Sequence, residues 1–292
     1  NTFVGSSAGT GLTTGVDNVA VGAGTLISAN GGNRSVAIGK NALSAQNAGS
    51  AGQNMYNTAV GYVAGQSITT GTKNTLIGGD VGVSLTIGNF NTALGYGALN
   101  ASVDGDYNTA IGYQALLAYE DGDGNGHNTA IGNQSQLNAS TGEFNTSLGS
   151  LSMGAGVTTG DGNTVLGYSA GLAITSGAEN VFIGSNAGDA LTTGYFNVGI
   201  GHEALSTEDG HGYNVAVGHH ALRVQDAGVD AYNTVVGYAA GAAVTTGIRN
   251  TIIGGLAGDV LTTGSYNVAI GHAALSTEDS YGKNTAVGYG DL

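Results

Sequence analysis

Apolar and polar positions recur along the chain in one short alternating pattern. Its clearest copy is Asn108-Thr109-Ala110-Ile111-Gly112. Seventeen copies occur, and they begin at residues 1, 18, 35, 57, 74, 91, 108, 128, 145, 163, 180, 197, 214, 233, 250, 267 and 284. Twelve of the sixteen spacings equal 17, and the others are 22, 20, 18 and 19. A period sustained over a whole chain indicates a repeat architecture, in which each repeat contacts its neighbours.

The five positions of this pentapeptide differ in what they tolerate. Position 1 is Asn in sixteen copies and Ser35 in the other, position 2 is Thr or Val, position 4 is Val, Ile or Leu, and position 5 is Gly. β-Branched residues in alternation predict a short β-strand, which the Gly ends either by a positive φ or by allowing a close approach of the next segment. We expect the Asn side chains to stack from rung to rung as an amide ladder.

These observations predict an all-β fold, a parallel β-solenoid of about 17 rungs with a 17-residue period. The remainder of each rung carries either an A-G…T-T-G pattern or an Ala-Leu pair. We interpret this second apolar cluster as a second short strand that closes a narrow coil. The whole of residues 1–292 is expected to form one continuous repeat domain, cut from a longer fibre.

Alternation places positions 2 and 4 on the same face of the strand, and we expect that face to point into the coil. Position 3 then faces outward, yet it carries no charge in any copy. An apolar outer column predicts coverage by another chain in an oligomer; the alternative is an Ala-rich face tolerated by a monomer. The larger residues of the expected interface are Phe3, Leu76, Val165, Phe182, Val235 and Ile252.

Aromatic residues also follow columns. One group immediately precedes the Asn, as Phe90 and Tyr107 do, and another immediately follows the Gly, as Tyr96 and Tyr113 do. Such spacing predicts ring stacks along the axis. A sugar-binding platform is the alternative interpretation.

Composition narrows the function classes. The chain has no Cys, which excludes disulfides and thiolate metal sites. Twenty acidic residues against six basic ones give a formal net charge of −14, which disfavours nucleic acid and anionic membrane surfaces as partners. No apolar stretch of about twenty residues predicts a membrane span.

Residues 121–126 give the best ligand candidate. Asp121, Asp123 and Asn125 match the first oxygen ligands of a calcium loop, although the acidic residue expected at its twelfth position is replaced by Gly132. Calcium is therefore an optional cofactor, and a solvated acidic turn is the alternative. His219-His220 is a weaker metal candidate. The chain carries no recognisable catalytic motif, so we expect no enzymatic activity.

Ser35-Val36-Ala37-Ile38-Gly39 resembles the run that recurs in head domains of trimeric autotransporter adhesins. The N-T-A-x-G-x-x-A-L and T-T-G repeats resemble the shafts of phage tail fibres. This resemblance spans the whole chain and implies a left-handed parallel β-roll with three chains about one axis. The adhesin heads have a shorter period than this chain, and their heptad stalk and membrane anchor do not occur in it. We therefore expect a tail fibre or a free filament and not an adhesin head.

Together, these patterns predict the shaft of an extracellular or virion appendage that presents an adhesive, receptor-binding tip. The expected partners are further copies of the chain, as a homotrimer or homofilament, and a surface glycan or protein receptor. The alternatives are a self-assembling cell-surface filament and a calcium-dependent or glycan-binding adhesin module. Nucleic-acid binding and membrane insertion are not expected.

Overall fold

A computed structural model of the chain describes residues 1–119, 125–277 and 279–290. These residues contain no helix, and their seventeen strands each span three residues, one strand per pentapeptide. The strands are β1 (Thr2–Val4), β2 (Val19–Val21), β3 (Val36–Ile38), β4 (Thr58–Val60), β5 (Thr75–Ile77), β6 (Thr92–Leu94), β7 (Thr109–Ile111), β8 (Thr129–Ile131), β9 (Thr146–Leu148), β10 (Thr164–Leu166), β11 (Val181–Ile183), β12 (Val198–Ile200), β13 (Val215–Val217), β14 (Thr234–Val236), β15 (Thr251–Ile253), β16 (Val268–Ile270) and β17 (Thr285–Val287).

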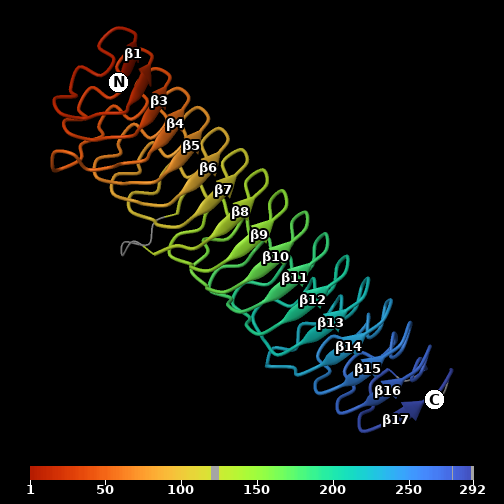
Figure 1. The fold of residues 1–292 in the computed structure, drawn as a ribbon. Helices are drawn as coiled ribbons and strands as arrows, with labels where there is room; N and C mark the ends of the chain where they lie inside the picture. The colour runs from red at the N-terminus through yellow and green to blue at the C-terminus, as the bar shows by residue number, and fades with distance from the viewer. Residues whose placement is uncertain (120–124, 278, 291–292) are drawn as a thin grey trace. The chain divides into compact units, whose positions relative to one another are not determined.

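The chain divides into two compact units, Asn1–Asn145 and Thr146–Leu292. Within each unit, every strand pairs in parallel with the next strand of the chain, so the rungs follow one another in sequence order (Figure 1). The register is constant, because each residue of a strand lies beside the residue at the same position of the next copy. The predicted all-β parallel β-solenoid, with one rung for each copy of the pentapeptide, is confirmed.

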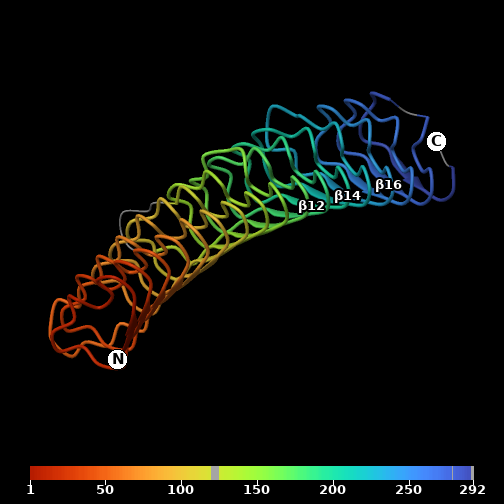
Figure 2. The same cartoon turned by 90° about the horizontal axis from the view of Figure 1, so that it is seen from above.

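The second strand expected in each rung is absent from the described residues. Turns and bends fill the rest of the rung, apart from two isolated bridges, Leu12 with Asn30 and Asn33 with Asn54. In the C-terminal unit the strands β12, β14 and β16 follow one side of the coil and the turns occupy the other (Figure 2). The Ala-Leu and A-G patterns are therefore turn sequences whose apolar side chains enter the core.

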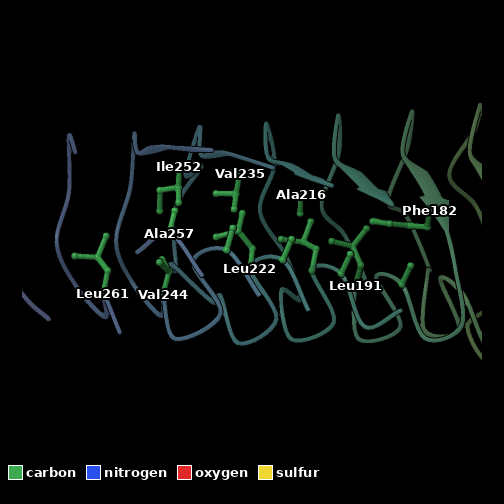
Figure 3. Close-up of a cluster of buried hydrophobic side chains, with 14 of the residues drawn as sticks. Phe182, Leu191, Ala216, Leu222, Val235, Val244, Ile252, Ala257 and Leu261 are labelled. Carbon is green, nitrogen blue, oxygen red and sulfur yellow. The ribbon is translucent and has the colours of Figure 1, made fainter. Parts of the chain in front are cut away.

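The middle residue of each strand points inward, opposite to the direction expected from the sequence. Ala20, Leu76 and Val165 are buried within the single chain. Figure 3 shows such side chains meeting apolar residues from the turn wall; the labelled strand residues include Phe182, Val235 and Ile252, and the facing residues include Leu191, Leu222 and Leu261.

The expected interface column is thus the inner column. Leu76, Val165, Phe182, Val235 and Ile252 belong to the core, and Phe3 of β1 is 41% exposed. Both faces of each strand carry uncharged residues, so alternation alone does not identify the inner face.

A narrow interior explains why small residues predominate at the middle position. The Leu and Ile side chains of the turn wall fill most of the space, which leaves room for Ala in most rungs. The large Phe182 in β11 lies beside the small Gly199 in β12, where an added side chain would collide with the Phe182 ring. At this pair of rungs, a large residue is therefore accommodated by a small one in the next rung.

The Asn ladder is confirmed, and it links side chains to backbone. The backbone N–H of Asn91 donates to Oδ1 of Asn74 at 2.9 Å, and Oδ1 of Asn91 accepts from the N–H of Asn108 at 2.9 Å. Nδ2 of Asn91 also donates to the carbonyl of Gly105 at 2.7 Å. Because these groups are buried, each bond satisfies a backbone group that water does not reach.

Both roles proposed for the pentapeptide Gly occur together. Gly95 has φ +133°, and a Cβ there would collide with the carbonyl of Gly112 in the next rung. Adjacent rungs therefore approach through their glycine backbones, and only Gly satisfies both requirements.

The inward orientation of the middle residue predicts a large cost for Ile252→Ala. Removal of a fully buried side chain should lower the free energy of unfolding by about 2–5 kcal/mol. Ile87→Ala, at a half-exposed turn position, should change it by about 1 kcal/mol or less. Urea denaturation followed by circular dichroism measures both; equal effects would contradict the assigned orientation.

The Asn ladder predicts that Asn91→Ala is destabilising by about 2–4 kcal/mol. The substitution removes the three hydrogen bonds of the side chain and leaves the N–H of Asn108 and the carbonyl of Gly105 without these buried partners. Asn133→Ala is the matched control, because Asn133 is exposed just after the strand. Similar urea midpoints for the two variants would show that the ladder does not stabilise the coil.

Candidate functional site: the outer face of the sheet

The first and third residues of every strand point away from the core and form the outer face of each unit. The first position is Thr or Val, and the third is Val, Ile or Leu. Ile77, Leu94 and Ile253 are 39%, 45% and 38% exposed. The outer face therefore consists of a Thr/Val row beside a row of larger aliphatic side chains.

No strand residue is charged, and the Thr hydroxyls are the main polar side-chain groups on this face. β-Branched side chains have few rotamers, so both rows are stiff. Their spacing is set by the parallel ladder beneath them. A stiff, uncharged, regularly spaced surface suits a flat apolar partner much better than a polar small molecule.

Two exposed columns of rings run beside the outer face. Phe90, Tyr107 and His127 stack in sequence, with centroid distances of 4.8 and 4.7 Å. In the second column, the rings of Tyr96 and Tyr113 lie 6.0 Å apart. The predicted ring stacks are confirmed.

Stacking limits what these columns can bind. In the first column, the faces of Tyr107 and His127 are occupied by the rings above and below, and a sugar platform requires an open face. Cations continue the first column where rings are lacking: Lys73 Nζ lies 4.4 Å from the Phe90 centroid, and the Arg249 guanidinium lies 5.5 Å from that of Tyr266. The geometry therefore favours a stabilising role for the columns.

The calcium candidate falls mainly outside the described residues, because Asp121 and Asp123 belong to 120–124. Asn125 is described and exposed, and its backbone carbonyl accepts a hydrogen bond from the Tyr119 hydroxyl at 2.9 Å. Asp106, a possible additional ligand, accepts hydrogen bonds from Asn89. Calcium binding stays a prediction.

A buried carboxylate that the sequence does not reveal lies in the C-terminal unit. Glu208 follows β12 in a turn, and its side chain is fully buried. Its Oε1 accepts a hydrogen bond from the His211 backbone N–H at 3.1 Å and lies 3.3 Å from the His211 Nδ1. Its Oε2 accepts from Nε2 of Gln225 at 3.3 Å, and that nitrogen also donates to Asn214 of the ladder.

Burial raises the pKa of Glu208, while the nearby His211 opposes the shift only in part. From the sequence alone, Glu208 is one member of a polar turn. Its burial follows from Gln225, which lies one full period later in the chain and therefore beside it in the next rung. The 17-residue period is therefore the sequence signal from which the contact between Glu208 and Gln225 could have been predicted.

Among the described residues, none lies in a helix long and apolar enough to cross a membrane. No protein-family model matches the chain, and no curated protein matches it.

The raised pKa of Glu208 predicts a specific pH dependence of stability. Between the unfolded value, near 4.5, and the higher folded value, the folded chain binds more protons than the unfolded chain. The stability associated with this group is therefore complete below the unfolded pKa and is lost as pH rises through the folded pKa. Glu208→Gln should reduce this loss, measured as urea midpoints from pH 4 to 8.

Glu179→Gln is the control for that experiment, because Glu179 is exposed. Burial raises the pKa of Asp189 as well. Its contribution to the pH dependence of stability is the same in the parent, in Glu208→Gln and in Glu179→Gln. A Glu208→Gln profile parallel to that of the parent would contradict the assigned environment of the carboxylate.

Proposed function

We propose that this chain is the structural shaft of a fibrous appendage, assembled as a homotrimer through the outer face and holding an adhesive tip away from a cell or virion surface. The observation that carries the proposal is the uncharged outer face, present on every strand of both units. It is supported by the resemblance of the repeats to tail-fibre shafts.

Charge favours self-association through this face. The chain has a net charge of −14, so copies repel each other wherever their acidic turns meet. The strands carry no charge, and contact along them brings aliphatic and Thr side chains together without burying a carboxylate. Contiguous exposed apolar surface of this kind is typical of a protein interface.

The repeat favours another copy of the same chain as the partner. Side chains on the outer face recur at the spacing of a parallel ladder, so a surface with the same period stays in phase over many rungs. Stacked identical side chains can then interdigitate as a dry interface. A partner with another period would fall out of register within a few rungs.

Two parallel rows suit a closed ring of chains. In a heterologous contact, the Thr/Val row of one copy meets the aliphatic row of the next, and such contacts close into a ring when the rotation permits. The number of three chains is taken from the resemblance to trimeric fibres. Each chain then uses both rows, with no row left exposed. The function follows from assembly: a shaft needs stiffness and length, and its buried core and Asn ladder supply the stiffness.

The oligomer should dissociate when charges are placed on the outer face. We expect the parent chain to have three times its 28.6 kDa mass in solution, measured by sedimentation equilibrium. Leu94→Asp with Ile253→Asp should reduce this to a single chain, because six carboxylates would enter the trimer interface without partners. Circular dichroism verifies that the variant remains folded.

Val229→Asp is the matched control, since Val229 is an exposed aliphatic residue in a turn. It should leave the mass unchanged. A monomeric parent, or a Leu94→Asp/Ile253→Asp variant that keeps the parent mass, would refute assembly through this face. Fibres of indefinite length would identify the chain as a self-assembling filament.

A further inference from the structure

Three imidazoles and one carboxylate gather on two successive rungs of the C-terminal unit. His202 and Glu203 follow β12, and His219 and His220 follow β13. The 17-residue spacing places His202 beside His219 and Glu203 beside His220. None of these residues takes part in the core or in the Asn ladder.

The three imidazoles approach closely enough to share a ligand, and Glu203 lies beside two of them. One ring nitrogen from each of the three His residues lies within 4.8 Å of the others. Glu203 Oε2 is 3.1 Å from His220 Nε2, and Glu203 Oε1 is 3.9 Å from His202 Nε2. All four residues come from one chain, so the cluster is complete without a partner.

We propose that His202, His219, His220 and Glu203 form a binding site for a divalent transition-metal ion of the zinc class. Imidazole nitrogens with one carboxylate are donors that suit Zn²⁺, Co²⁺ and Ni²⁺, whereas Ca²⁺ and Mg²⁺ require mainly oxygen ligands. Three His and one Glu also supply the four ligands of a tetrahedral zinc ion.

Modest side-chain movement completes the site. Zn–N bonds of about 2.0–2.1 Å require donor atoms roughly 3.4 Å apart in a tetrahedron, whereas the three imidazole nitrogens now lie within 4.8 Å of one another. The rings of His202 and His219 are stacked at 5.0 Å and 17°, and a shared ion must lie in the plane of both. Metal binding therefore tilts the two rings toward each other, which their partial exposure allows.

The carboxylate of Glu203 lies beside two of the three imidazoles. Glu203 is positioned to complete the coordination or to orient the His220 ring.

The chain contains an internal control for this cluster. Seventy residues after His202, His272 occupies the same column, but the next rung carries Tyr289 and Gly290 in place of the two His residues. The rings of His272 and Tyr289 stack at 5.2 Å. The duplicate therefore keeps the ring stack and, of the four proposed donors, retains only the imidazole of His272.

This duplicate suggests the decisive substitution, His219→Tyr, which removes one ligand and preserves a ring in the column. Titration of the purified full chain with Co²⁺, followed by visible absorption, should show one tetrahedral ion per chain, and Zn²⁺ should displace it. His219→Tyr and His220→Gln should each weaken Co²⁺ binding about tenfold or more. Far-UV circular dichroism verifies that both variants remain folded.

Two variants serve as controls. His272→Gln removes the isolated His of the duplicate, and His211→Gln removes the only imidazole from the second cluster of possible ligands, formed with Glu208, Asp209 and Asp226. Both should bind Co²⁺ as the parent does. Absence of saturable tetrahedral Co²⁺ binding, parent affinity in His219→Tyr, or loss of binding in His211→Gln would overturn the proposal.

Discussion

Each rung of this protein satisfies its backbone through the two neighbouring rungs, and the rest of the structure depends on this constraint. A three-residue strand and a series of turns have few hydrogen-bond partners of their own. Backbone groups therefore pair with residues one period away, as in the bond from the Thr92 N–H to the Asn108 carbonyl. The constant register that results places like residues beside like: Asn on Asn, Gly on Gly and ring on ring.

Like-on-like stacking explains both the constant and the variable features of the repeats. At Gly95 and its equivalents, two backbones meet so closely that no side chain fits. At Asn91, the side-chain amide is hydrogen-bonded to Asn74 in the preceding rung and to Asn108 in the following rung. Replacement of this Asn in one rung therefore affects both neighbouring rungs. The core is less strict, because Phe182 in one rung is balanced by Gly199 in the next.

The sequence predicted several features correctly because they follow directly from the period. The parallel solenoid, the Asn ladder, the role of the Gly and the ring stacks all depend on which residues lie 17 positions apart. The proximity of His202 to His219 follows in the same way. Glu203 with His220, and Glu208 with Gln225, are also 17 residues apart and lie together for the same reason. The distances between their side-chain atoms depend on the path of the turns, which the period does not specify.

The inner and outer faces of the strand were decided by tertiary structure alone. Ala110 and its equivalents alternate with Thr109 and Ile111, and both sets are uncharged, so periodicity separates two faces without identifying the inner one. The turn wall resolves this ambiguity, because its Leu and Ile side chains fill a narrow interior and leave room mainly for Ala. The larger Ile and Leu residues are consequently turned outward. The sequence thus determined the rungs and their register, and packing across the coil determined which side chains lie on the outer face.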